Sequence, residues 1–192
     1  MCIFVLCQII HRLYFDCMFG LRKYGKRLAY LLRHDTQYAF DPHGWRKVED
    51  LITCHGFTME LLCAIVKTDD KGRYEFDETC SLIRARQGHT IQVDVELEEL
   101  TPPDRLFHGT IRSVAQVIAE SGIKKMKRLY VHLSGSEAVA KTVGARYGEP
   151  VVLIVDSKRM AEDGIPFYRS RNGVWLTDYV DHKYILNRTD FI

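Results

Sequence analysis

Leu100-Thr101-Pro102-Pro103-Asp104 is the best candidate for a linker that divides this chain into two parts. Two consecutive prolines cannot continue a helix, because each lacks a backbone N–H, and they do not suit a central strand either. The chain of 192 residues is long enough for one large domain or two small ones. We therefore expect one lobe over residues 21–100 and a second lobe over residues 101–192.

Before the prolines, the sequence predicts three helices followed by a hairpin. Apolar residues recur at three- and four-residue steps over Leu21–Arg33, which is typical of a helix with one buried face. Val48–Cys54 and Met59–Val66 are expected to be shorter helices, and Arg73–Phe76 and Ser81–Ile83 to pair as strands. This order is that of a winged helix, a fold often used on nucleic acid, although a fold by itself does not show binding.

The pattern changes at Thr90–Leu97, where polar and apolar residues alternate strictly, as in a half-buried strand. After the prolines, short strands and helices follow one another. The second lobe is therefore predicted to be mixed α/β, and the whole chain α+β. Its expected strands lie at residues 105–107, 129–133, 150–155, 167, 174–176 and 184–185. Its expected helices lie at residues 111–120 and 134–147, the second opened by the capping box Ser134-x-x-Glu137 and closed by Gly148.

The composition excludes several classes of protein. The net charge is only +2, so a nucleic acid would have to be held by a local patch and not by a global basic field. The cysteines form no C-x-x-C pair, and we expect neither a metal site nor a disulfide framework. Reduced thiols are typical of a cytoplasmic protein. The six cysteines are Cys2, Cys7, Cys17, Cys54, Cys63 and Cys80.

The first twenty residues are unusually apolar, which raises the question of a signal peptide or a membrane anchor. Met1–Ile10 lacks a basic leader and a small-residue cleavage site. His11, Arg12 and Asp16 then interrupt the run well short of a spanning length. We interpret residues 1–20 as an extra N-terminal helix or a mis-assigned start, and we expect no membrane association.

The strongest functional signal is Ile83-Arg84-Ala85-Arg86-Gln87-Gly88-His89-Thr90, which gathers many hydrogen-bond donors around one glycine. Guanidinium groups match phosphate oxygens bidentately, and backbone N–H groups beside a glycine can approach an anion closely. Taken alone, the octapeptide fits a solvated basic turn equally well. Leu31-Leu32-Arg33-His34, a second Arg/His pair at the end of an apolar helix, favours a phosphate site.

Other polar residues at turns each have an ordinary structural explanation. His108-Gly109-Thr110 fits a helix start capped by Thr110, with the alternative that Gly109 lets an anion approach the helix N-terminus. His132 fits a core histidine, Asn172-Gly173 a hairpin turn, and Arg146 a helix C-terminus. The sequence has no Walker loop, no G-x-G-x-x-G and no G-x-S-x-G. The polar residues at these turns suit stabilisation of negative charge better than acid–base hydrolysis.

Taken in order, these segments resemble the RNA 2′-phosphotransferase family from about residue 24 to residue 186. The resemblance implies a winged-helix lobe followed by a lobe with the ADP-ribosyltransferase fold, which binds NAD⁺. The motifs that carry it are Leu31-Leu32-Arg33-His34, Asp41-x-x-Gly44-Trp45, Ile83-Arg84-Ala85-x-Gln87-Gly88-His89, Leu106-x-His108-Gly109-Thr110, Val131-His132-Leu133-Ser134, Val143-Gly144-x-Arg146-x-Gly148-x-Pro150 and Asn172-Gly173-Val174-Trp175-Leu176-Thr177.

The resemblance also implies a reaction and a set of roles. An internal RNA 2′-phosphate would attack the nicotinamide ribose of NAD⁺ and expel nicotinamide. The ribose O2″ would then attack the phosphate, leaving a 2′-hydroxyl on the RNA and releasing ADP-ribose 1″,2″-cyclic phosphate. The RNA would be a tRNA or another 2′-phosphorylated strand, and we expect a monomer. The implied catalytic residues are Arg33, His34, Arg84 and Arg146; the implied NAD⁺ contacts are His108, Gly109, Thr110, His132, Ser134, Asn172, Gly173 and Val174. The expected RNA contacts are Arg86, Gln87 and His89, although Arg86 stands where the family often has a neutral residue.

Two alternatives stay open at this point. The same NAD⁺ lobe could ADP-ribosylate a terminal phosphate of a nucleic acid or a protein side chain, although Val174-Trp175-Leu176 lacks the glutamate that protein ADP-ribosyltransferases usually carry there. The chain could instead be a non-catalytic winged-helix RNA-binding protein. Such a protein would need neither Arg146 nor the pair of His108 and His132.

Overall fold

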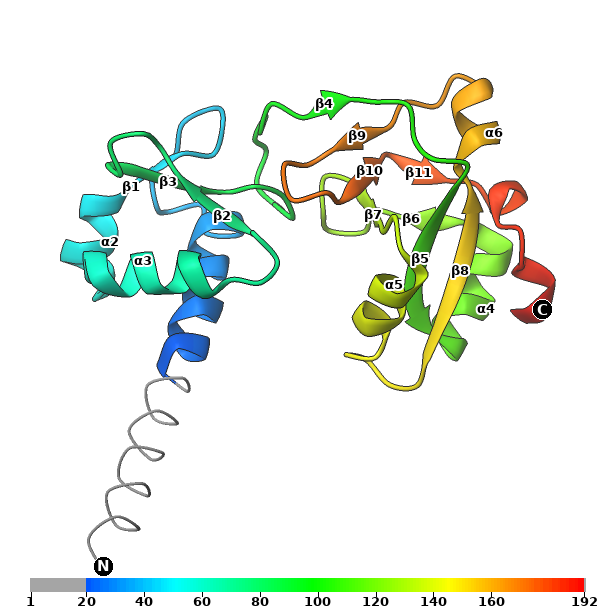
Figure 1. Cartoon of the computed structure of the whole chain (residues 1–192), viewed down its shortest axis with the longest axis horizontal. Helices are drawn as coiled ribbons and strands as arrows, with labels where there is room; N and C mark the ends of the chain where they lie inside the picture. The colour runs from blue at the N-terminus through cyan, green and yellow to red at the C-terminus, as the bar shows by residue number, and fades with distance from the viewer. Residues whose placement is uncertain (1–19, 192) are drawn as a thin grey trace, which may run out of the picture. The chain divides into compact units, whose positions relative to one another are not determined.

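The computed structural model describes residues 20–191, which divide into two compact units (Figure 1). The first unit ends at Val93 and the second begins at Asp94. The segment that ends in the two prolines belongs to the second unit, because the backbone N–H of Leu100 donates to the carbonyl of Phe167 at 3.0 Å. The chain therefore passes from one unit to the other ahead of the proline pair.

The first unit combines three helices with a small antiparallel sheet. Residues 20–33 are helical. The sheet has the strand order β1-β3-β2, with β3 in the centre. The predicted three helices and hairpin are confirmed, and β1 joins the hairpin as a third strand. The remaining elements are β1 (Arg46–Lys47), α2 (Val48–His55), α3 (Met59–Thr68), β2 (Tyr74–Phe76) and β3 (Leu82–Ala85).

The core of the first unit lies between the apolar faces of the helices and the sheet. Leu28 and Leu32 from the first helix are fully buried together with Leu51, Leu62 and Ile83 from the following elements. Burial of such side chains is the main stabilising contribution, about 1.5–3 kcal/mol for each large apolar side chain. The three- and four-residue spacing of apolar residues therefore corresponds to this core.

The second unit is mixed α/β, as the sequence predicted at that level. Its largest sheet has the order β4-β9-β10-β7, and two further pairs are β5-β8 and β11-β6. Its elements are β4 (Glu98–Glu99), β5 (Arg105–Ile111), α4 (Arg112–Ser121), β6 (Ile123–Lys124), β7 (Val131–Leu133), α5 (Glu137–Gly144), β8 (Pro150–Asp156), α6 (Ser157–Glu162), β9 (Tyr168–Arg169), β10 (Trp175–Thr177), β11 (Tyr179–Val180) and the 3₁₀ turns η1 (His182–Tyr184) and η2 (Arg188–Phe191).

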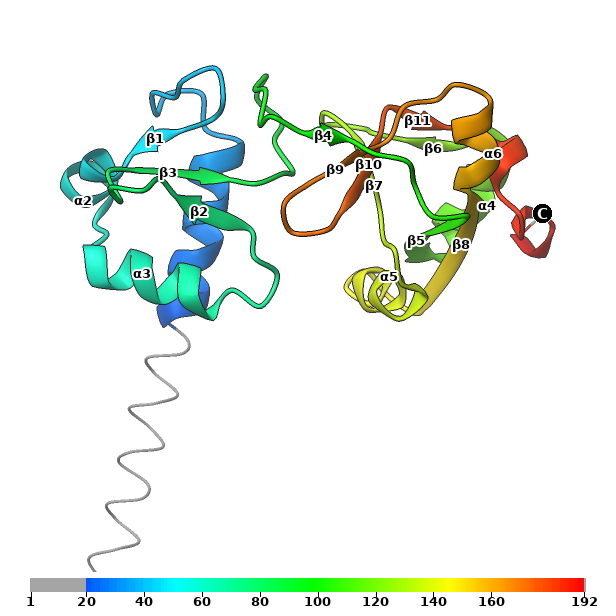
Figure 2. The same cartoon turned by 45° about the horizontal axis from the view of Figure 1, so that its top comes forward.

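Helix α5 packs against the β5-β8 pair (Figure 2). A Cβ atom on Gly109 of β5 would lie 1.7 Å from the carbonyl oxygen of Ala140 in α5. A Cβ atom on Gly144 would lie 2.8 Å from the carbonyl oxygen of Thr110. The two glycines therefore allow the backbones of the helix and the strand to touch.

The prediction of a strand over Thr90–Leu97 is wrong. Ile91 and Val93 are buried, so the alternation does mark an inner face, but this segment belongs to no ladder in the described chain. The backbone N–H groups of Thr90 and Ile91 donate to the carbonyl of Arg33 and not to a neighbouring strand. Glu96 has a φ of 55°, which a strand does not accommodate. Only Glu98–Glu99 pairs, with β9.

The expected helix boundaries in the second unit also need correction. Ser134 does not open a capping box, because its backbone pairs with that of Phe107, and α5 begins at Glu137 without a side-chain cap. The helix ends at Gly144, ahead of the predicted end. Thr110 lies inside β5 and is not the N-cap of α4, whose N-cap residue is Ile111. At the expected strand of residues 184–185, Tyr184 ends the turn η1 and Ile185 forms an isolated bridge with Val155.

Over residues 20–191, no single helix is long and apolar enough to cross a membrane. Helices α2 and α3 meet that criterion only as a pair that is bent by 115° at the break between them. The predicted N-terminal helix over residues 1–20 lies outside the described residues, apart from Gly20.

Candidate active site

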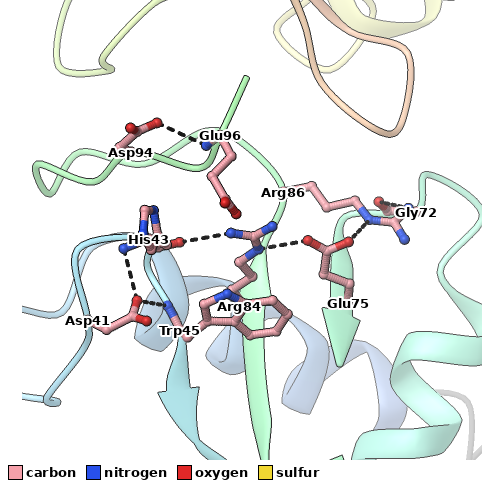
Figure 3. Close-up of polar contacts among 9 residues, drawn as sticks. All are labelled: Asp41, His43, Trp45, Gly72, Glu75, Arg84, Arg86, Asp94 and Glu96. Carbon is pink, nitrogen blue, oxygen red and sulfur yellow. Dashed lines mark hydrogen bonds and ion pairs between the residues drawn. The ribbon is translucent and has the colours of Figure 1, made fainter. Parts of the chain in front are cut away.

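A tight turn in the first unit explains the Asp41-x-x-Gly44-Trp45 motif. The Asp41 carboxylate accepts hydrogen bonds from the backbone N–H groups of His43 at 2.9 Å and Trp45 at 2.8 Å (Figure 3). Gly44 has a φ of 79°, which favours glycine, and its N–H donates to the carbonyl of Asp41. The turn therefore fixes both the carbonyl of His43 and the ring of Trp45.

The guanidinium of Arg84 is held on three sides by these and other groups. Its Nε donates to Glu75 at 2.7 Å, and its Nη1 donates to the carbonyl of His43 at 3.3 Å (Figure 3). Its Cζ lies 4.4 Å from the centroid of the Trp45 ring, a cation–π arrangement. Arg84 is only 1% exposed. The plane of its guanidinium is therefore set by the protein before any ligand arrives.

Arg86 shares the carboxylate that holds Arg84. Its Nε donates to the second oxygen of Glu75 at 3.1 Å, and its Nη1 donates to the carbonyl of Gly72 at 3.2 Å. Glu75 lies directly opposite Arg84 in the β2-β3 register. One buried carboxylate thus contacts two arginines, and the formal charges of the three side chains sum to about +1. Gln87 follows in the loop after β3.

The loop after β3 folds over the end of the first helix and brings the two Arg/His motifs together. The Oγ of Thr90 lies 3.0 Å from Nδ1 of His34. A Cβ atom on Gly88 would lie 3.5 Å from Cζ of Arg33, and Gly88 has a φ of 89°. Glycine at this position therefore provides both the backbone conformation of the loop and a close approach to the Arg33 guanidinium.

His89 is buried between these arginines. It is 2% exposed, and its Nε2 has no hydrogen-bond partner within the described chain. Burial lowers the pKa of His89 to about 3, and neighbouring positive groups contribute to the shift. The ring is therefore neutral at physiological pH. Those groups are Arg33, Arg46, His34 and Arg84.

Sequence reasoning missed two residues of this cluster, Arg46 and Glu75. Arg46 is 1% exposed, donates to the carbonyls of Asp35 and Tyr38, and lies over the rings of Tyr38 and Phe40. Glu75 could have been found from the hairpin register, which places it opposite Arg84. Nothing in the pattern around Arg46 indicates that its side chain is buried.

In the second unit, His108 and His132 lie close together on β5 and β7. Nδ1 of His108 lies 3.2 Å from the carbonyl oxygen of His132, and Nδ1 of His132 lies 3.1 Å from that of Tyr130. A carbonyl can only accept, so Nδ1 carries the hydrogen in both rings and the neutral form has Nε2 as an acceptor. Burial lowers the pKa of His108, and the hydrogen bond to His132 opposes that effect.

The β9-β10 hairpin holds the Asn172-Gly173-Val174 segment. Oγ of Ser170 accepts from the N–H of Val174 at 3.1 Å and lies 2.8 Å from Oδ1 of Asn172. Gly173 has a φ of 80°, so the predicted hairpin turn is confirmed. Ser170 therefore fixes the shape of this turn.

The remaining predicted site residues also belong to the second unit. Ser134 pairs through its backbone with Phe107, and Gly109 and Thr110 lie within β5. Arg146 is exposed just after α5. Thus three of the four predicted catalytic residues belong to the first unit, and Arg146 belongs to the second. Among residues 20–191, no group of three or more His, Cys, Asp or Glu residues could hold a metal ion.

Comparison with known proteins gives consistent matches. A model of the RNA 2′-phosphotransferase, Tpt1 / KptA family matches residues 21–179. A Nostoc punctiforme protein named probable RNA 2′-phosphotransferase is 43% identical over 173 residues, covering 86% of this chain and 96% of its own length. Proteins of the same name from Acaryochloris marina and Escherichia coli are each 41% identical, over 174 residues (86% of this chain, 96% of the relative) and 170 residues (84% and 88%) respectively.

Proposed function

Because this chain belongs to the RNA 2′-phosphotransferase (Tpt1 / KptA) family of enzymes, we propose that it transfers an internal RNA 2′-phosphate to NAD⁺. The products are RNA with a 2′-hydroxyl, nicotinamide and ADP-ribose 1″,2″-cyclic phosphate. On this proposal the first unit is the winged-helix RNA lobe and the second is the NAD⁺ lobe with the ADP-ribosyltransferase fold. The order of three helices and a three-stranded sheet in the first unit supports the first assignment.

The observation that carries the proposal is the arginine and histidine cluster of the first unit. Arg33, His34 and Arg84 come together there with a buried, neutral His89. Guanidinium groups fixed before the substrate binds stabilise a phosphate better than water does, because they need no reorganisation when negative charge develops. Phosphate chemistry can proceed on arginines alone at a site of this kind.

The proposed reaction has two steps. In the first, a 2′-phosphate oxygen attacks C1″ of the nicotinamide ribose, and the C1″–N bond breaks with its electron pair leaving on nicotinamide. In the second, O2″ attacks phosphorus and the bond from phosphorus to O2′ breaks. O2″ loses a proton and O2′ gains one, and His34 is the group that would carry it. Arg33, Arg84 and Arg146 would stabilise the charge on the phosphorane-like state.

The second unit would bind NAD⁺ through the two histidine strands and the β9-β10 turn. With Nδ1–H donated to backbone carbonyls, His108 and His132 have fixed ring orientations, and each neutral ring has Nε2 as its acceptor, which suits ribose hydroxyls. Ser134, Asn172 and Val174 are the further proposed contacts. The packing of α5 leaves no room for a side chain at position 109, so only the backbone of Gly109 would remain for a ligand.

The test uses an oligoribonucleotide with one internal 2′-phosphate, with and without NAD⁺, and mass spectrometry of the products. We expect NAD⁺-dependent conversion to the 2′-hydroxyl strand and the cyclic phosphate. Arg146→Ala should reduce the rate about 100-fold or more. Arg112→Ala, which removes another exposed arginine of the second unit, is the control and should keep the wild-type rate.

Other outcomes would separate the alternatives. An ADP-ribosylated RNA that accumulates without further conversion would mean that the second step fails. ADP-ribose attached only to terminal phosphates would favour the terminal-phosphate transferase. RNA binding without any NAD⁺-dependent change would contradict the enzymatic proposal for this substrate.

A further inference from the structure

Glu75 is a buried acidic residue in a cluster whose proposed ligand is an anion. Its side chain is 8% exposed, and its two oxygens accept from Nε of Arg84 at 2.7 Å and Nε of Arg86 at 3.1 Å. A buried carboxylate is costly unless it is paired, so these contacts account for its stability. They also place a negative charge against the guanidinium that the proposed function assigns to the 2′-phosphate.

A single pair of Glu75 and Arg84 would be neutral and would attract a phosphate weakly. Arg86 supplies the second positive charge, so that the group of three keeps a net charge of about +1. Arg86 donates two hydrogen bonds within the protein, from Nε to Glu75 and from Nη1 to the carbonyl of Gly72. The side chain of Arg86 is 28% exposed. These contacts suit a residue that acts on Glu75 more than one that reaches for an RNA backbone.

We propose that Arg86 is a positioning residue that balances the charge of Glu75 beside Arg84, and so strengthens the attraction of this cluster for the RNA 2′-phosphate. This role replaces the direct RNA contact that the sequence suggested for Arg86. It rests on the proposed function, because it takes the 2′-phosphate as the ligand of Arg84. Glu75 in turn orients Arg84 together with His43 and Trp45.

The test measures binding without turnover. Two oligoribonucleotides of the same sequence, one with an internal 2′-phosphate and one with a 2′-hydroxyl, are titrated in the absence of NAD⁺. The ratio of the two Kd values reports how strongly the phosphate is recognised. In Arg86→Gln, Glu75 neutralises Arg84 alone, and the preference for the phosphate should fall about tenfold.

Restoring the charge balance should restore the preference. The double variant Glu75→Gln/Arg86→Gln leaves Arg84 with its full charge and an amide oxygen for its Nε, and we expect a preference within about threefold of the wild type. Arg86→Lys keeps the charge without the guanidinium geometry and should retain most of the preference. Arg73→Gln is the control, since it removes an arginine paired with Asp69 beside the same hairpin and should change nothing.

Three results would overturn the proposal. If Arg86→Gln weakens both RNAs equally, Arg86 is an RNA-backbone contact. If Arg86→Gln loses the preference and the double variant does not recover it while both melt like the wild type, charge balance is not its role. If the wild type itself does not prefer the 2′-phosphate, the proposed function fails and this inference fails with it. Arg86→Lys decides the case in which Arg86→Gln does not fold.

Discussion

The side chain of His89 shows how single residues in this cluster are governed by burial among cations. It is 2% exposed, and both the loss of water and the nearby arginines penalise a charged ring, which lowers its pKa to about 3. A neutral imidazole adds no charge to the cluster but keeps one N–H that can donate. His89 is thus suited to contact a phosphate as a neutral donor while the arginines supply the charge.

The low pKa of His89 predicts how stability depends on pH. The unfolded chain binds a proton at His89 below about pH 6.5, whereas the folded chain does so only near pH 3. Between these values the unfolded state binds more protons, so stability falls as pH is lowered. At pH 5 the contribution of His89 should be a loss of about 2 kcal/mol relative to pH 8.

Urea denaturation of the wild type and of His89→Gln at pH 8 and pH 5 measures this contribution. The variant should lose about 2 kcal/mol less than the wild type between the two pH values. Equal losses in the wild type and His89→Gln would show that His89 is not kept neutral by the fold.

The sequence indicates which residues belong to the candidate site, but it does not show which contacts most of them make. The donors around Gly88 are visible in the sequence, whereas the sharing of Glu75 by Arg84 and Arg86 depends on the hairpin register. The burial of Arg46 depends on a loop, residues 34–45, that wraps its guanidinium with carbonyls and rings. The contacts of Arg46 are set by tertiary structure, and local patterns carry no signal for them.

At the scale of elements, the packing of α5 on β5 depends on the absence of a Cβ atom at Gly109. A Cβ atom at Gly109 would overlap the backbone of Ala140, and a helix backbone cannot yield as a flexible side chain does. Gly109→Ala should therefore destabilise the second unit by about 3 kcal/mol or more. Scanning calorimetry measures the effect as a lowered melting temperature.

Gly135→Ala is the matched control for that experiment. A Cβ atom there would lie 3.8 Å from the nearest side-chain atom, which is an ordinary contact. Its free energy of unfolding should stay within about 0.5 kcal/mol of the wild type, and its melting temperature should change little. Equal melting temperatures for Gly109→Ala and the wild type would mean that the helix moves away from the strand without cost.

The elements themselves were predictable where local periodicity and local chemistry agree. The first helix, α2, α3 and the β9-β10 turn follow from apolar spacing and turn residues within a few positions. The predictions failed where a distant partner decides the outcome. Thr90–Leu97 alternates like a strand, but its first backbone N–H groups donate to the carbonyl of Arg33 at the end of the first helix. Ser134 pairs through its backbone with Phe107 and does not cap α5.

At the scale of the whole molecule, the balance of charge limits how RNA can be bound. The chain has 27 Lys and Arg residues against 25 Asp and Glu residues, and a net charge of +2. Two of the arginines at the proposed site are also paired with one carboxylate. On the proposed function, recognition would therefore depend on a few phosphate contacts in one place and not on a broad positive surface.

Few phosphate contacts predict a weak dependence of RNA binding on salt. Each neutralised phosphate of a single strand contributes a slope of about −0.7 to the logarithmic salt dependence, so two or three contacts correspond to a loss of about tenfold between 50 and 200 mM salt. Titration of the 2′-phosphorylated oligonucleotide at several KCl concentrations measures the slope. A loss of about 1,000-fold would instead require about seven contacts. Such a loss would place much of the RNA on a surface outside the arginine cluster, because Arg33, Arg84 and their neighbours cannot supply that many.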